Sequence, residues 1–140
     1  MYQLPGYPLW IGHAGEGRDL AHLLDEGIEA IVQLASEEPP LDTPRDLIYC
    51  RFPLTDGADN PSQLLTMAAH TVAELLARRV PTFVCCSLGM SRSPVIVAAA
   101  LALETHEAPE VCLKRVLVHH PGDVSAALWN NMFELLPSAH

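Results

Sequence analysis

The sequence contains few basic residues and no long apolar run. Among its 140 residues, 8 are Lys or Arg and 17 are Asp or Glu, which gives a formal net charge of −9. A surface with this charge repels nucleic acid and anionic lipid, so we expect no nucleic-acid partner. The most apolar stretch, residues 95–103, is far shorter than the roughly 20 residues that a membrane helix requires. We therefore expect no membrane partner.

The spacing of cysteine and histidine excludes two further classes. The four cysteines show no regular spacing, and the chain does not start with a basic segment followed by an apolar one. Secreted disulfide scaffolds and secretory leaders have those features, so we expect a cytoplasmic protein. No histidine is spaced from another histidine or from a cysteine as a zinc site requires, since the adjacent His119 and His120 diverge. We expect no metal.

The patterns that are present predict one α/β domain over residues 1–140. This length suits a single domain that buries roughly 68% of its unfolded surface. Apolar runs predict strands, and apolar residues at i, i+3 and i+4 predict helices. Because the two kinds alternate, we expect a central, mainly parallel β-sheet flanked by helices. The predicted strands are 9–11, 28–34, 46–54 and one that starts at 82, and the predicted helices are 18–26, 62–79, 93–106, 109–119 and 124–136.

Other segments are predicted from their composition. Residues 2–8 hold two prolines and a glycine and are expected to be irregular, and residues 13–17, HAGEG, to form a turn. Residues 36–46 are rich in Pro, Glu and Asp, which predicts a surface loop with solvated charges. The amphipathic helices 109–119 and 124–136 are expected to cover one face of the sheet.

The most informative stretch is residues 82–94, TFVCCSLGMSRSP. It begins as an apolar strand, passes through a short loop and enters a helix rich in Ala, Val and Leu. Pro94 suits the first turn of that helix, because its missing N–H would be unpaired there. Free backbone N–H groups and the positive end of the helix dipole converge at such a terminus, which favours anion binding.

Cys86 and Arg92 flank this loop with five residues between them. A loop of this length can curl around one tetrahedral anion, with the sulfur below phosphorus and the planar guanidinium holding two oxygens. The amides, the dipole and Arg92 all favour a thiolate, so we expect the pKa of Cys86 to fall below about 8.5. Gly89 is expected to adopt a φ that a side chain would resist, or to allow a close approach of the backbone to the ligand. The predicted phosphate-binding residues are Ser87, Leu88, Gly89, Met90, Ser91 and Arg92.

The two adjacent cysteines are expected to have different roles. Successive strand residues face opposite sides of a sheet, so Cys85 is expected to point away from the loop and into the packing. The alternative is that Cys86 is also a small buried apolar residue, which is a common fate of cysteine. Arg92 would then be an unexplained charge beside a core helix.

CSLGMSRS resembles the signature loop of the cysteine-dependent phosphatases, Cys-x5-Arg-Ser/Thr, and GMSRSP is similar to its dual-specificity branch. The opening LWIG, the later DEGI and the strand AIVQLA are also similar to the start of those catalytic domains. The resemblance implies a cysteine-phosphatase-like fold for most of the chain. The family usually has a histidine before its nucleophile, where this sequence has Cys85.

The resemblance also implies roles for four residues. Cys86 would be the nucleophile, Arg92 the phosphate ligand, and Ser93 the hydroxyl that bonds the sulfur, with a plain helix N-cap as the alternative for Ser93. The family's general acid stands after a strand, some thirty residues before the nucleophile. Asp56 fits that position, and Asp59 is the alternative candidate. A turn or cap aspartate is the non-catalytic reading of either.

Together these expectations predict a phosphomonoester hydrolase that acts through a cysteinyl-phosphate intermediate and needs no cofactor. Because no basic residue lies between Cys86 and Arg92, a phosphorylated protein is favoured as substrate, with phosphotyrosine and also phosphoserine or phosphothreonine accepted. The alternatives are a non-catalytic phosphate-binding module and a phosphatase of a small phosphorylated metabolite or lipid. A disulfide from Cys86 to Cys85 or Cys50 is a further hypothesis.

Overall fold

Five strands form one sheet in the order β1-β2-β5-β3-β4, in a computed structural model that describes residues 1–137. Strand β1 is antiparallel to β2, and the other neighbouring strands run parallel. The predicted mainly parallel sheet is therefore confirmed. The predicted domain, residues 1–140, also includes 138–140, which lie outside the described residues. The strands are β1 (Tyr2–Gln3), β2 (Leu9–Gly12), β3 (Ala30–Ala35), β4 (Ile48–Leu54) and β5 (Thr82–Cys85).

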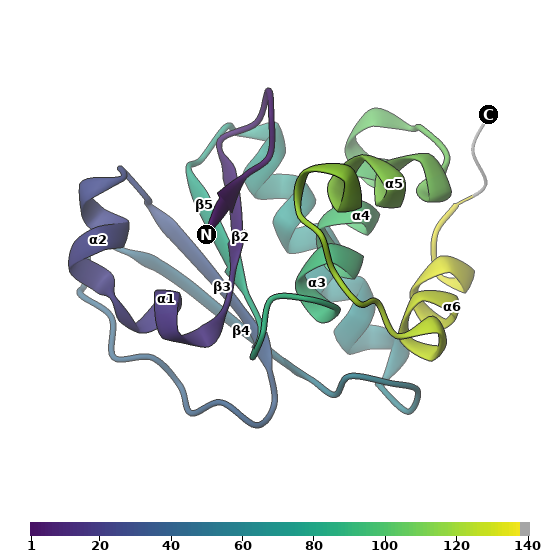
Figure 1. The fold of residues 1–140 in the computed structure, drawn as a ribbon, viewed down its shortest axis with the longest axis horizontal. Coiled ribbons are helices and arrows are strands. Elements are labelled where there is room, and N and C mark those ends of the chain that lie inside the picture. Colours follow the sequence, from purple (N-terminus) through teal and green to yellow (C-terminus); the bar gives the residue numbers. More distant parts are fainter. Residues whose placement is uncertain (138–140) are drawn as a thin grey trace.

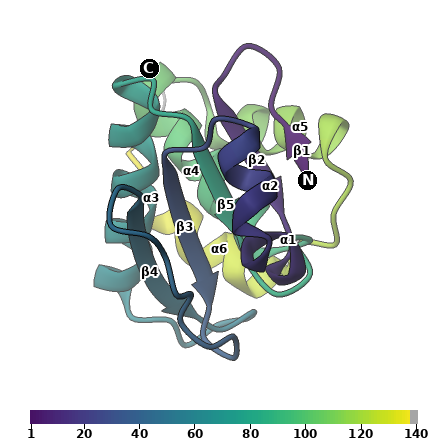
Figure 2. The same ribbon diagram turned by 90° about the vertical axis from the view of Figure 1, so that its left-hand side faces the viewer.

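Helices cover both faces of the sheet, but unequally (Figures 1 and 2). Two short helices, α1 (Ala14–Arg18) and α2 (Leu20–Asp25), lie on one face. Their core is small, with six buried apolar residues around Ile31 and Phe83. The other face carries the larger core, because four helices pack there. These helices are α3 (Ser62–Ala77), α4 (Arg92–Thr105), α5 (Pro109–His119) and α6 (Ala126–Glu134).

Helix α4 lies at the centre of the larger core. Every residue from Arg92 to Ala102 is buried, as expected for a helix that is apolar nearly all round. Helices α5 and α6 pack mainly on α4, on its side away from the sheet. The two helices therefore lie on one face of the sheet, as predicted, but α4 separates them from the strands.

The N-terminal segment contains more regular structure than its composition predicted. Tyr2–Gln3 forms β1 instead of an irregular segment, and residues 13–17 lie largely in helix α1 instead of a turn. His13 caps α1 by accepting a hydrogen bond from the Glu16 amide while Glu16 accepts one from His13 N. The predicted helix at 18–26 begins later, at Leu20, because Asp19 caps α2.

The parallel strands bring four chain segments to one edge of the sheet. The carboxyl ends of β2, β3, β4 and β5 meet there, which is where open α/β sheets bind ligands. The edge therefore collects the residues after Gly12, Ala35, Leu54 and Cys85.

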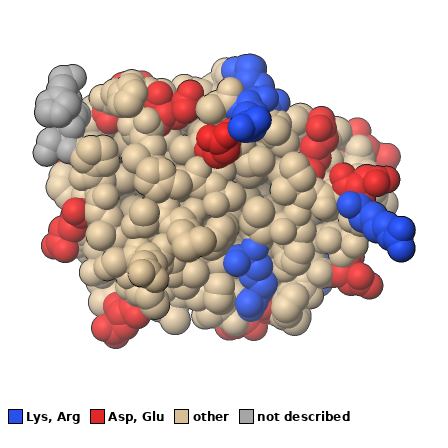
Figure 3. Space-filling view, turned by 180° about the vertical axis from the view of Figure 1, so that it is seen from behind, with Lys and Arg blue, Asp and Glu red and all other residues tan. Residues whose placement is uncertain are grey.

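Two features of the whole molecule bear on its surroundings. Within the described residues, no helix is both long and apolar enough to cross a bilayer. Figure 3 shows a face on which few basic side chains appear and acidic side chains lie around the margin. This distribution agrees with the net charge of −9.

Candidate active site

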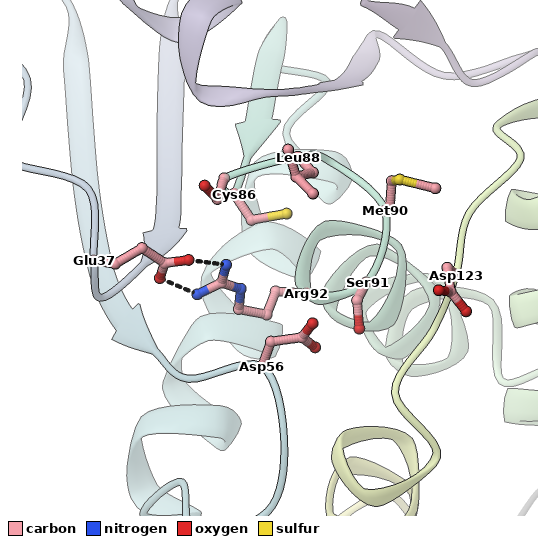
Figure 4. Close-up of a pocket in the computed structure, with 9 residues that line it drawn as sticks. Glu37, Asp56, Cys86, Leu88, Met90, Ser91, Arg92 and Asp123 are labelled. Carbon is pink, nitrogen blue, oxygen red and sulfur yellow. Dashed lines mark hydrogen bonds and ion pairs between the residues drawn. The ribbon is translucent and has the colours of Figure 1, made fainter.

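A pocket of about 240 Å³ lies at the carboxyl edge of the sheet (Figure 4). It contains Cys86, Arg92 and Asp56, three of the four residues to which the sequence assigned catalytic roles. Five of the six predicted phosphate-binding residues line the pocket, Arg92 among them, and Gly89 does not. The full lining is Glu37, Asp56, Cys86, Ser87, Leu88, Met90, Ser91, Arg92 and Asp123.

The loop of residues 86–92, called the phosphate loop below, packs against the end of β2. Gly89 has a φ of +75°, a left-handed conformation that favours glycine. A Cβ atom at this position would lie 2.7 Å from the Gly12 carbonyl oxygen, so a side chain would also clash. Ala14 N donates to the Ser87 carbonyl at 3.0 Å and ties the loop to α1. The expected backbone conformation of Gly89 is confirmed, and the close approach that the structure shows is to the end of β2.

The two cysteines lie on opposite faces of the sheet. Cys86 belongs to the larger core and lines the pocket, and its sulfur points into the space between Leu88 and Arg92 in Figure 4. Cys85 belongs to the smaller core, where burial raises the pKa of its thiol to about 12. The prediction that Cys85 points away from the loop is confirmed.

Arg92 is buried and makes a two-pronged ion pair with Glu37. Its Nη1 lies 2.5 Å from Glu37 Oε1, and its Nη2 lies 2.6 Å from Oε2. Nη1 also donates to the Leu54 carbonyl at 2.9 Å, at the end of β4. The hydrogen bonds from Arg92 hold the pKa of the Glu37 carboxyl below its usual range. The pair fixes the plane of the guanidinium while its Nε remains without a partner among the described residues.

Glu38 holds the other side of the loop. Its Oε2 accepts a hydrogen bond from Ser87 Oγ at 2.9 Å, and its Oε1 pairs with Arg18 at 3.1 Å. The prediction that the charges of residues 36–46 are just solvated was therefore wrong for Glu37 and Glu38, because both carboxylates form ion pairs. Both residues directly follow β3, so the rule that ligands gather at the carboxyl ends of parallel strands was a signal that could have identified them.

Asp56 lies on a loop that closes on itself. The side chain of Asn60 accepts from Thr55 N at 2.9 Å, and its Nδ2 donates to the Thr55 carbonyl at 2.9 Å. Asp56 thus lies in a turn after β4 that these hydrogen bonds hold in place, and it lines the pocket. Asp59 is exposed, has a φ of +70° and does not line the pocket. Of the two candidate acids, the structure therefore brings only Asp56 to the site.

The N-terminus of α4 differs from the prediction by one residue. The helix begins at Arg92 and its N-cap residue is Ser91, so the N-cap alternative for Ser93 was wrong. Ser93 is fully buried, and its Oγ has no hydrogen-bond partner among the described residues. The predicted hydrogen bond from Ser93 to the Cys86 sulfur is therefore not formed in this structure. An unpaired buried hydroxyl costs free energy.

The segment between α5 and α6 supports the outer side of the phosphate loop, which the sequence did not predict. His120 Nε2 lies 2.6 Å from the Gly89 carbonyl oxygen, so this nitrogen carries the proton in that contact. Asp123 N donates to the Met90 carbonyl at 2.9 Å, and Ser125 N donates to Ser91 Oγ at 2.9 Å. These contacts join residues more than thirty positions apart, and no local sequence pattern announces them.

The residues described here show two further features that concern metals and disulfides. Across residues 1–137, no group of three or more His, Cys, Asp or Glu side chains is placed to hold a metal ion. All four cysteines are free thiols. Because Cys85 and Cys86 face opposite sides of the sheet, the structure does not favour a disulfide between them.

Comparison with known proteins identifies the fold. No protein-family model matches the chain, and no curated protein matches its sequence. The solved structure of human DUSP28 matches with a TM-score of 0.83 at 17% identity, over 96% of this chain and 94% of that one. A mouse putative dual specificity phosphatase, complexed with zinc tungstate, matches with a TM-score of 0.79 at 20% identity, over 91% and 81%.

A third similar structure is the human tyrosine phosphatase-like serine/threonine/tyrosine-interacting protein. It matches with a TM-score of 0.80 at 17% identity, over 96% of this chain and 93% of that one. These matches extend over nearly the whole chain and agree with the resemblance carried by residues 86–94. The chain therefore has the fold of the dual-specificity phosphatases.

Proposed function

We propose that the protein is a cysteine-dependent phosphomonoester hydrolase that acts on phosphorylated proteins. The observation that carries this proposal is the convergence of Cys86, Arg92 and Asp56 on one pocket. A nucleophile, a cationic phosphate ligand and a carboxylic acid are the three groups that such a reaction needs. The mouse structure with tungstate adds support, because tungstate is a tetrahedral oxyanion like phosphate.

In the first step, the Cys86 thiolate attacks phosphorus and forms a sulfur–phosphorus bond. The bond from phosphorus to the leaving oxygen breaks as Asp56, in its protonated form, donates a proton to that oxygen. The backbone amides of the phosphate loop and the Nε–H of Arg92 bind the other phosphate oxygens. Glu37 holds the rest of the guanidinium, so Arg92 needs no reorientation when substrate binds.

In the second step, water hydrolyses the cysteinyl-phosphate. The Asp56 carboxylate takes a proton from the water as its oxygen attacks phosphorus, and the sulfur–phosphorus bond breaks. Inorganic phosphate and the Cys86 thiolate are the products, and Asp56 is again protonated. The unpaired hydroxyl of Ser93 would donate a hydrogen bond to the departing sulfur. No cofactor enters either step.

The composition of the pocket favours a protein substrate. Among the residues that the structure describes, Arg92 is the only basic one in the lining, and Glu37 already neutralises part of its charge. A phosphorylated lipid headgroup or metabolite with several phosphates would meet carboxylates where it needs cations. Leu88 and Met90 line the pocket and are 74% and 42% exposed. We expect this partly exposed pocket to take phosphotyrosine and also phosphoserine and phosphothreonine.

The test is hydrolysis of a generic aryl phosphate from about pH 5 to pH 8, the range in which carboxyl and thiol groups control such reactions. We expect the wild type to turn over and Cys86→Ser to be inactive. In the Asp56→Asn variant, the hydrolysis rate should no longer fall at the basic end of the pH range, because that fall reports deprotonation of the general acid.

One outcome would replace this proposal by the non-catalytic alternative. If the wild type fails to hydrolyse the aryl phosphate but binds inorganic phosphate, and Arg92→Ala abolishes that binding, the chain is a phosphate-binding module. The matched substitution Arg78→Ala, on the exposed end of α3, controls for loss of one positive charge.

A further inference from the structure

The mouth of the pocket carries an unusual set of charges for a site that binds a phosphate dianion. Its charged lining residues are Glu37, Asp56, Arg92 and Asp123, three acidic and one basic. Glu37 pairs with Arg92, and no ion pair involves Asp56 or Asp123 within the described residues. Because Asp56 is already assigned to the proposed reaction, Asp123 is the remaining carboxylate at the rim without an ion pair among the described residues.

Asp123 is held at this place by the phosphate loop itself. Its backbone N–H donates to the Met90 carbonyl at 2.9 Å. The preceding residue, Gly122, lies so close that a Cβ atom there would be 2.5 Å from the same carbonyl oxygen. In Figure 4, Asp123 lies beyond Met90, at the opposite end of the view from Glu37. The backbone position of Asp123 at the rim is therefore set by the phosphate loop.

A second observation shows that this rim belongs to a ligand site. Arg92 is 5% exposed, lines the pocket, and its Nε has no hydrogen-bond partner among residues 1–137. Leaving such a donor unpaired is costly unless a ligand completes it. The pocket thus prepares an anion site at its floor and a negative charge at its rim.

We propose that Asp123 is a specificity-determining residue that selects phosphorylated residues flanked by Lys or Arg. This inference rests on the proposed function. The phosphate reaches Arg92 and the loop amides at the floor. A neighbouring cationic side chain of the same peptide pairs with Asp123, and its apolar stem lies on Leu88 and Met90. An acidic neighbour would instead be repelled by the Asp123 carboxylate.

The experiment compares two phosphotyrosine peptides that differ only in carrying Lys or Glu on both sides of the phosphotyrosine. We expect the wild type to have a kcat/KM about fivefold higher for the Lys peptide at low salt, the upper range for an exposed ion pair. Asp123→Asn should bring the ratio close to one, and Asp123→Lys should reverse it. Asp25→Asn, which removes an exposed charge from α2, should keep the wild-type ratio.

Salt provides a second readout of the same contact. Exposed charges are screened over about 10 Å at 0.1 M salt and about 3 Å at 1 M. The preference for the Lys peptide should therefore decline as salt rises, while the Asp123→Asn ratio stays constant. A preference that ignores salt, or that survives Asp123→Asn, would overturn the assignment to Asp123.

The design separates failure of this inference from failure of the proposed function. Hydrolysis of an aryl phosphate, which has no flanking residues, tests the function alone. The same ratio is also measured as the affinity of Cys86→Ser for the two peptides, which requires no turnover. If the wild type hydrolyses the aryl phosphate but has the same kcat/KM for the Lys and Glu peptides, only the proposed specificity is overturned. A lack of both hydrolysis and peptide binding overturns both proposals.

Discussion

The two faces of the sheet differ in what they do at its carboxyl edge. At the end of β5, Cys86 lines the pocket on the α4 side and Cys85 is packed on the α1 side. After β3, Glu37 reaches Arg92 of α4, whereas Glu38 reaches Arg18 of α1. Two pairs of neighbouring residues are thus divided between the faces. The residues proposed to do the chemistry thus lie on the α4 side, and the α1 side supports the loop through Glu38 and Ala14.

The largest difference is expected between the two cysteines. Cys86→Ser should lower the turnover of an aryl phosphate on the order of 10⁴-fold or more, as loss of the nucleophile does in other covalent enzymes. Cys85→Ser places a hydroxyl among apolar side chains and should cost about 1–3 kcal/mol of unfolding free energy. Its turnover should remain within a few-fold of wild type. Steady-state rates and urea unfolding of both variants measure the contrast.

A folded Cys85→Ser variant that is as inactive as Cys86→Ser would break the division between the faces. Circular dichroism of both variants is the control, because a lost fold would remove activity for a trivial reason.

The next contrast is between two aspartates of one loop. Asp56→Asn should lower kcat about 10²-fold to 10⁴-fold with an aryl phosphate, the usual contribution of a general acid. Asp59→Asn should leave kcat nearly unchanged, because Asp59 does not line the pocket and Asn also tolerates its positive φ. The pH profile of kcat is the measurement. Equal effects of the two substitutions would remove Asp56 from the mechanism.

The sequence predicted the parts of this site that are local. Residues 86–92 fold around one short loop, so spacing, a glycine and a following helix were sufficient to find them. The parallel sheet was predictable for a similar reason, since each strand and helix carries its own apolar period. Ion pairs across long sequence separations have no such pattern, which is why Glu37 and Asp123 were missed.

The errors at the ends of elements have a different physical cause. His13 is an uncommon cap residue, and HAGEG has the composition of a turn, yet its capping bonds make α1 helical. Strand β1 forms because Tyr2 and Gln3 pair with the edge of β2, a tertiary contact that composition does not encode. Local propensity is a weak prior where such contacts exist.

The third prediction concerns the alkaline stability of the α1 face. The pKa of Cys85 is about 12 in the folded chain, against about 8.5 when unfolded. Above pH 8.5 the unfolded chain releases this proton and the folded chain keeps it, so stability falls as pH rises. The loss is about 1.4 kcal/mol for each pH unit. Cys85→Ala should therefore lose about 2 kcal/mol less than wild type between about pH 8 and pH 10.

Urea unfolding at the two pH values measures this difference. Val84→Ala is the matched control, because it truncates a buried neighbour in β5 that does not titrate. It should lower stability by a similar amount at both pH values. If wild type and Cys85→Ala lose the same unfolding free energy between the two pH values, the Cys85 thiol ionises without unfolding and this prediction is wrong.

The smallest effect is expected from the paired carboxylates after β3. The pKa of Glu37 is lowered by its hydrogen bonds from Arg92, so its stabilising effect is present above the unfolded pKa of about 4.3. It is lost as pH falls through the lower folded pKa. Because the Glu37 side chain is 52% exposed, solvent reduces this contribution. Glu37→Gln should therefore lose slightly less stability than wild type on acidification from about pH 5 to pH 3.

Activity separates Glu37 from Glu38 more clearly than stability does. Glu37→Gln loosens the guanidinium that we propose binds phosphate, so it should raise the KM of an aryl phosphate. The kcat, measured at saturating substrate, should change less. Glu38→Gln keeps an acceptor for Ser87 Oγ and weakens only the exposed pair with Arg18. Its KM should stay near the wild-type value. Equal rises in KM would mean that both carboxylates support the phosphate loop together. The two faces of the sheet would then differ in function only at Cys85 and Cys86, after β5, and not at Glu37 and Glu38, after β3.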